Sequence, residues 1–201
     1  VAPTDARVLI TGENGSGKST LIEAIAIASG LNPEGGSQNF NFKTTNSYSE
    51  LYKKLIISKT GDRPKTKYFL RAESFYNVAS EIERAFREDG NIDMLMSHGG
   101  KSLHNCSHGE AFITLIENRF YDKGLYILDE PEAALSPLRQ MQLLILIDKL
   151  VKNGSQLIIA THSPILLSYP NATIHDFDNN MEIIKYEDTE NYKLYKMFIE
   201  N

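Results

Sequence analysis

The chain has 201 residues, of which 41% are hydrophobic and 23% are charged, and this balance excludes a disordered protein. Its formal net charge of −5 does not predict a basic surface for nucleic acid, although a local basic patch remains compatible with it. The single cysteine, Cys106, excludes an internal disulfide, so we expect a reducing compartment, the cytoplasm.

Neither a membrane anchor nor a secretory leader is expected. The longest apolar run, LLILI at 143–147, is too short to span a bilayer. The first residues, VAPTDAR, lack the apolar segment of a signal peptide, and the absence of an initiator Met suggests a trimmed N-terminus.

The first half of the chain alternates strand and helix patterns. RVLIT at 7–11 is a short apolar run that predicts a buried strand before a glycine loop, and TLIEAIAIAS predicts a buried helix that stops at Gly30. Residues 32–67 carry little signal: an edge strand fits one part, and YSELYKKLIIS fits either a helix or a strand. The remaining predicted elements are a strand at 67–71, an amphipathic helix at 74–88, and a helix at about 108–120.

The second half continues this alternation. Its predicted elements are a strand at 124–130, a helix at 136–154 with Pro137 in its first turn, a strand at 155–164, a terminal hairpin, and a closing helix whose Tyr192, Tyr195 and Phe198 are expected in core or interface packing. Strands that are apolar on both faces and alternate with helices indicate an α/β fold, a mostly parallel sheet covered by helices on both faces. We therefore expect one domain over residues 1–201, with a helical insertion at 72–122.

The glycine loop GENGSGKS at 12–19 matches G-x-x-x-x-G-K-[ST] between a predicted strand and a helix. Glycines let the backbone N–H groups point inward at a phosphate, and the helix adds its N-terminal dipole. Lys18 is placed to reach the β- and γ-phosphates and Ser19 to ligate Mg²⁺. The alternative is a glycine turn that binds nothing. The full expected set is Gly12, Asn14, Gly15, Ser16, Gly17, Lys18, Ser19 and Thr20.

Polar residues follow two of the other predicted strands. LYILDE delivers Asp129 and Glu130 to a strand end, where open α/β sheets bind ligands. Asp129 suits a Mg²⁺ site, and Glu130 could then polarise an attacking water; two solvated acids are the alternative. THSP places His162 at the same edge, either as a γ-phosphate sensor or as an ordinary polar residue.

The stretch NCSHGE at 105–110 begins a predicted helix. Ser107 and Glu110 form a capping box, which alone would explain the pattern. The glycine at 109 would also let an anion approach the helix start closely, so Ser107 and Gly109 are candidate phosphate contacts. His104, Cys106 and His108 alternate and could hold zinc, although a fourth ligand is missing nearby.

These motifs together resemble the ABC-type ATPase superfamily, and within it the soluble SMC and RecF-like branch and small stand-alone predicted ATPases. GENGSGKST resembles Walker A, LYILDE Walker B, PEAALSP the D-loop, ATHSP the switch-histidine segment, and SHGE the signature motif in its S-x-G-E form. The resemblance implies a P-loop NTPase that hydrolyses ATP with Mg²⁺ and forms an ATP-sandwiched homodimer. Glu130 would be the base, His162 the sensor, and Ser107 and Gly109 would bind the γ-phosphate held by the other subunit.

Two departures from the family pattern concern ligands. The usual Gln at the end of a strand before the signature is absent from YFLRAESF, where Glu73 is the nearest metal candidate or else a helix N-terminal acid. No aromatic residue precedes the glycine loop to stack on a base, so ATP and GTP are not distinguished.

Three functions remain open. The leading one is an ATPase serving DNA maintenance or defence, with DNA or a protein as the partner. The alternatives are a nucleotide-gated switch that recruits a protein and the ATP-binding subunit of a transporter, which the missing Gln and the S-x-G-E signature weaken.

Overall fold

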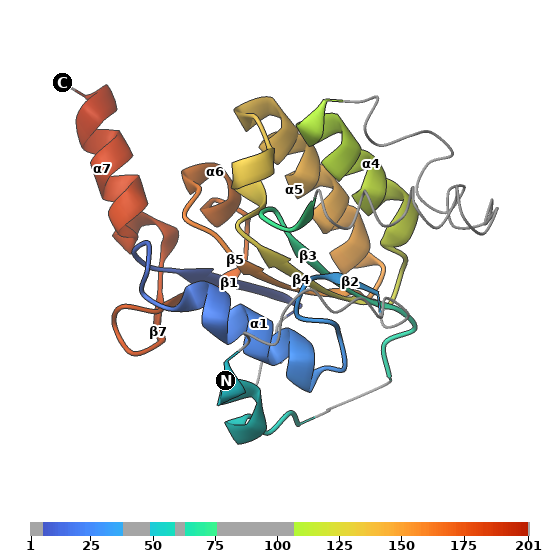
Figure 1. Cartoon of the computed structure of the whole chain (residues 1–201). Coiled ribbons are helices and arrows are strands. Elements are labelled where there is room, and N and C mark those ends of the chain that lie inside the picture. Colours follow the sequence, from blue (N-terminus) through green and yellow to red (C-terminus); the bar gives the residue numbers. More distant parts are fainter. Residues whose placement is uncertain (1–5, 38–48, 59–62, 76–106, 201) are drawn as a thin grey trace.

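A seven-stranded sheet organises the fold (Figure 1). The computed structural model describes residues 6–37, 49–58, 63–75 and 107–200. The strands are β1 (Arg7–Thr11), β2 (Gly36–Ser37), β3 (Lys67–Arg71), β4 (Leu125–Asp129), β5 (Gln156–Ala160), β6 (Thr173–Asp176) and β7 (Glu182–Ile184). The helices are α1 (Lys18–Ala28), α4 (His108–Arg119), α5 (Pro137–Lys152), α6 (Pro164–Leu167) and α7 (Glu190–Ile199), with 3-10 turns η1 (Glu50–Lys54), η3 (Pro131–Ala134) and η4 (Tyr186–Asp188).

The centre of the sheet is parallel. The strand order is β2-β3-β4-β5-β1-β6-β7, and only the outer pairs β2–β3 and β6–β7 are antiparallel. In the register of the central strands, Asp129 pairs with Arg71 on one side and with Ala160 on the other. The carboxyl ends of β3, β4 and β5 therefore meet at one edge, which is where open α/β sheets bind ligands.

Alternate residues of each strand enter two cores, one on each face of the sheet. Ile127 and Ile158 pack with Ile22 of α1, whereas Leu128 and Ile159 pack on the other face against α4 and α5. Figure 1 shows α1 on one face and α4, α5 and α6 on the opposite one. This two-sided burial explains why the strand sequences are apolar without alternation, and it confirms the predicted α/β fold.

Several predicted elements are shorter or better defined than the sequence indicates. The strand predicted over 155–164 ends at Ala160, because Ser163 caps α6 by accepting from the Ile165 and Leu166 amides. Residues 50–54, which fitted helix or strand, form η1, and the terminal hairpin is β6–β7. The predicted helix at 74–88 lies almost entirely outside the described residues, as do His104, Cys106 and much of the proposed insertion at 72–122.

The closing helix α7 corrects one expectation. It extends away from the sheet (Figure 1) and buries none of its residues. Phe198 is 82% exposed and Tyr195 52% exposed, so neither belongs to the core, while Tyr192 packs edge-on against Tyr186 at 4.9 Å between ring centroids. Core packing of these aromatics is therefore wrong, and interface packing stays a prediction. Among the described residues, no helix has the length and apolar character needed to cross a membrane.

Candidate functional site

The glycine loop joins β1 to α1 and has the backbone conformation of an anion cradle. Gly15 and Gly17 have φ of 82° and 107°, values that side-chain-bearing residues rarely adopt. Gly17 precedes α1 and gives it no side-chain cap. The first N–H groups of α1 therefore have no capping acceptor within the helix start, and they suit a phosphate.

Lys18 lies over this loop. Its side chain is buried, with 3% of the residue exposed, and Nζ donates to the carbonyl oxygens of Gly12, at 2.9 Å, and of Glu13. The buried Ser16 hydroxyl has no hydrogen-bond partner among the described residues, so it can still contribute to a ligand. Asn14 within the loop and Thr20 in the first turn of α1 are exposed.

The loop after β6 packs against the glycine loop, a contact that the sequence did not indicate. The Asp178 carboxylate accepts a hydrogen bond from the Glu13 amide at 2.5 Å, and a Cβ added at Gly17 would lie 3.6 Å from the Phe177 ring. Residues 13 and 178 are 165 positions apart, so local sequence carries no signal for this contact.

Ser19 connects the glycine loop to the acidic strand end. Its hydroxyl donates to Oδ1 of Asp129 at 3.1 Å, and Oδ2 of Asp129 lies 3.3 Å from Nε of Arg71. Arg71 also donates to Glu23 of α1 at 2.9 Å. The strand register explains the contact between Arg71 and Asp129, because these residues are paired on neighbouring parallel strands.

Asp129 is an almost fully buried carboxyl, with 5% of the residue exposed. Burial raises its pKa to about 6, although Arg71 and the Ser19 hydrogen bond counteract this rise and Glu130 and Glu132 add to it. The site thus holds a carboxylate whose charge is not fully compensated, and a cation bound there would supply the missing compensation.

Glu130 turns the chain sharply at the end of β4. Its φ and ψ are 46° and 53°, a left-handed conformation unusual for glutamate, and its amide donates to the Ala160 carbonyl at 3.0 Å. Such strained residues cluster at functional sites and cost of order 1 kcal/mol or more. The turn leaves the Glu130 side chain 34% exposed at the sheet edge.

His162 lies beside two acids. Its Nδ1 is 3.9 Å from Oε1 of Glu130 and 3.3 Å from Oε1 of Glu132. The sequence placed Glu132 only within the D-loop-like segment, yet its side chain is 7% exposed and accepts three hydrogen bonds from the segment 161–163. The sequence shows an acid two positions after Glu130, but its hydrogen-bond partners at 161–163 could be identified only from the register of β4 and β5.

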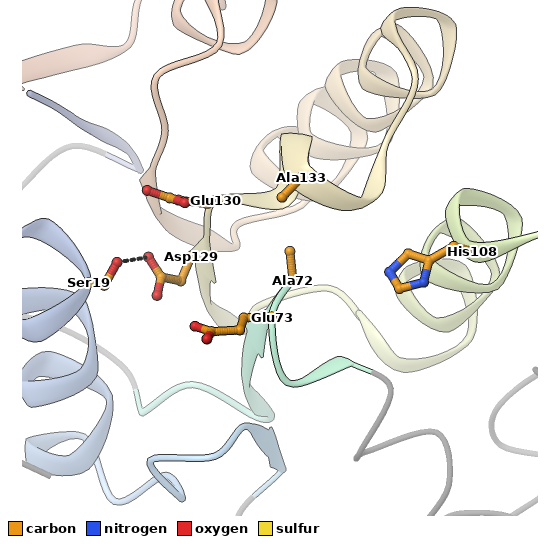
Figure 2. Close-up of a pocket in the computed structure, with 7 residues that line it drawn as sticks. All are labelled: Ser19, Ala72, Glu73, His108, Asp129, Glu130 and Ala133. Carbon is orange, nitrogen blue, oxygen red and sulfur yellow. Dashed lines mark hydrogen bonds between the residues drawn. The ribbon is translucent and has the colours of Figure 1, made fainter. Parts of the chain in front are cut away.

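A hollow of about 400 Å³ lies between these residues (Figure 2). Ser19, Asp129 and Glu130 line it on one side, and His108 of α4 lies across from them. Glu73 also lines it, with 90% of its side chain exposed and Oε2 at 3.9 Å from Arg71. Both interpretations of Glu73, metal candidate and helix N-terminal acid, stay open.

The start of α4 confirms the predicted cap. Ser107 accepts from the Glu110 amide at 3.4 Å, and His108 packs edge-on against Phe75. A Cβ at Gly109 would lie 3.0 Å from the Ala134 carbonyl, so glycine also allows α4 to approach η3 closely. His108 itself lines the hollow, together with Ser19 and Asp129.

The fold and the site together define a P-loop nucleoside triphosphatase. Family comparison makes the assignment more specific: the family model described as "ABC transporter" matches residues 2–133, more than half of the chain. The chain therefore belongs to this ABC-type family and is an ATPase. A second model, "AAA domain, putative AbiEii toxin, Type IV TA system", matches residues 111–168.

Solved structures of similar architecture include an SMC head domain from Thermotoga maritima, 17% identical, with TM-score 0.45 and 86% of each chain covered. Another is CbiO1 from Clostridium perfringens, part of the ABC transporter complex CbiONQ, 18% identical, with TM-score 0.48, 96% of this chain covered and 84% of that chain. No curated protein sequence matches the chain significantly.

Proposed function

We propose that this chain hydrolyses ATP with Mg²⁺ and that ATP draws two copies together. The 3.1 Å contact between Ser19 and Asp129 carries the proposal, because it joins the glycine loop to the acidic strand end. A phosphate held by the loop and a metal between these two side chains would be neighbours, as phosphoryl transfer requires.

The residues present fit Mg²⁺. This ion prefers oxygen ligands, and it is usually bound by one or two carboxylates together with phosphates and water. Ser19 and Asp129 offer a hydroxyl and a buried carboxylate 3.1 Å apart, and Glu73 lines the same hollow. When bound, Mg²⁺ would neutralise charge on the phosphates.

The other proposed roles follow from position. Lys18 would exchange its carbonyl contacts at Gly12 and Glu13 for phosphate oxygens. Glu130, exposed at the turn after β4, would accept a proton from the attacking water, and His162 would contact the γ-phosphate. The protein's work is chiefly positioning and charge stabilisation.

The start of α4 is the proposed contact between the two copies. Ser107 and Gly109 would bind the γ-phosphate of ATP held by the other copy, using the helix dipole and the first-turn N–H groups. The place of His108 in the hollow also allows this helix start to serve the phosphate of its own chain. Mixing variants, described in the Discussion, separates the two arrangements.

The proposed process is DNA maintenance or defence. The match of residues 111–168 to a domain described with a putative AbiEii toxin supports the defence alternative. The family described as "ABC transporter" keeps an ATP-binding transporter subunit as a second candidate, and a membrane protein copurifying from the native host would favour it.

Steady-state phosphate release tests the proposal. We expect ATP turnover with Mg²⁺, none with EDTA, and stimulation by DNA if DNA is the partner. Stable ATP binding with no turnover under any of these conditions would instead support the nucleotide-gated switch.

A further inference from the structure

Glu132 anchors the segment that carries His162. Its Oε1 accepts hydrogen bonds from the Thr161 hydroxyl at 2.7 Å, the His162 amide at 2.7 Å and the Ser163 amide at 3.2 Å. Three donors from consecutive residues thus converge on one carboxylate oxygen. The strand register brings the two segments together, because Asp129 of β4 pairs with Ala160 of β5.

The same carboxylate faces the imidazole ring. Nδ1 of His162 is buried and makes no hydrogen bond among the described residues, although Oε1 of Glu132 lies 3.3 Å away. The second oxygen of Glu132, Oε2, is also buried without a hydrogen-bond partner there. Leaving a buried ring nitrogen and a buried carboxylate oxygen without hydrogen bonds costs free energy unless the two groups pair. Hydrogen bonds at such sites often tighten only when a ligand binds.

The exposed part of the ring lies away from Nδ1. The His162 side chain is 41% exposed as a whole while its Nδ1 is buried, so Nε2 is the nitrogen left for a ligand. The backbone of His162 is fixed as well, by the Glu132 carboxylate at its amide and by the Asn191 side chain, which donates to its carbonyl at 2.7 Å. Only the ring remains to be oriented.

We propose that Glu132 is a positioning residue that accepts a hydrogen bond from Nδ1–H of His162 and thereby turns Nε2 toward the nucleotide. The inference rests on the proposed role of His162 at the γ-phosphate. A carboxylate on one ring nitrogen fixes the tautomer and the orientation of the ring, as carboxylates behind metal-ligating histidines do. A hydrogen bond from Nε2 to a phosphate oxygen then requires a second ring proton, because Nδ1 keeps its own.

Nitrogen-15 NMR of the imidazole rings tests this directly, with the His162 signals assigned by their loss in His162→Gln. In the neutral ring of the unaltered protein without nucleotide, we expect the proton on Nδ1. A proton on Nε2 alone in this state would overturn the proposal, and the measurement does not depend on turnover.

Two variants separate orientation of the ring from anchoring of the loop. Glu132→Gln keeps an acceptor for the three donors but loses the charge, so we expect a larger share of Nε2–H and a kcat about 10-fold lower or more, with KM for ATP little changed. Thr161→Val removes one donor but keeps the carboxylate, so the tautomer should stay on Nδ1. Equal tautomer populations in the two variants would overturn the proposal and leave Glu132 as a loop anchor. Absence of turnover in the unaltered protein would instead contradict the proposed function, while the tautomer measurement would still stand.

Discussion

Ser19 of α1 and Asp129 of β4 are 110 residues apart in the chain, yet the Ser19 hydroxyl donates to the Asp129 carboxylate at 3.1 Å. This bond closes the side of the hollow formed by the glycine loop and the central strands (Figure 2). The bond thus links α1, the helix that follows the glycine loop, to a carboxyl that is buried among apolar strands. The predictions below follow from this arrangement.

Asp129→Asn should change how stability depends on pH in the presence of EDTA. Burial raises the pKa of Asp129 to about 6 from 3.8, so between these values the folded state holds a proton that the unfolded state has released. Stability from this group is therefore greatest at low pH and is lost as pH rises through 6. From pH 5 to pH 7.5 the unaltered protein should lose about 1 kcal/mol relative to Asp129→Asn.

Urea unfolding at several pH values measures this difference. Glu23 still pairs with Arg71 in the variant, so the arginine is not left alone. A stability difference between the two proteins that stays constant from pH 5 to pH 7.5 would show that the buried carboxyl does not titrate as described.

Glu130→Gln should bind ATP and lose turnover, because the amide keeps the shape of the side chain but cannot accept a proton. If ATP joins two copies, the bound dimer should accumulate and be visible by light scattering. Glu182→Gln, on the exposed edge strand β7, is the matched control and should behave as the unaltered protein. Hydrolysis by Glu130→Gln at the parental rate would show that Glu130 is not the base.

Mixing two inactive variants tests which chain supplies the start of α4. Ser107→Arg and Lys18→Ala should each be inactive alone. A mixed dimer holds one site in which Lys18 from one chain faces Ser107 from the other, so part of the activity should return. Ser49→Arg, which removes the capping serine of η1 instead, controls for the loss of a helix cap.

The mixing result also decides between the two arrangements open to α4. If the helix start serves its own chain, no mixed dimer contains an intact site. Mixed dimers that demonstrably form and yet regain no activity would therefore end the proposal of a shared site.

The sequence predicted most of the sheet and the motifs at its edge, because buried parallel strands are apolar on both faces and their polar ends stand out. It did not predict the bonds from Glu132 to residues 161–163, since these depend on the pairing of Asp129 with Ala160 across two strands. The sequence also did not predict that Phe198 on α7 is exposed. An amphipathic pattern predicts an apolar face but not whether the chain itself covers that face.

Calorimetric titration of ATP into Lys18→Ala tests whether the glycine loop binds the phosphates. Lys18 is the cation placed over the glycine loop, and its loss removes the charge that the account assigns to the phosphates. We expect no measurable ATP binding by this variant, and unchanged binding by Lys149→Ala, an exposed lysine of α5. ATP affinity in Lys18→Ala equal to that of the unaltered protein would contradict the assignment of this loop as the phosphate site.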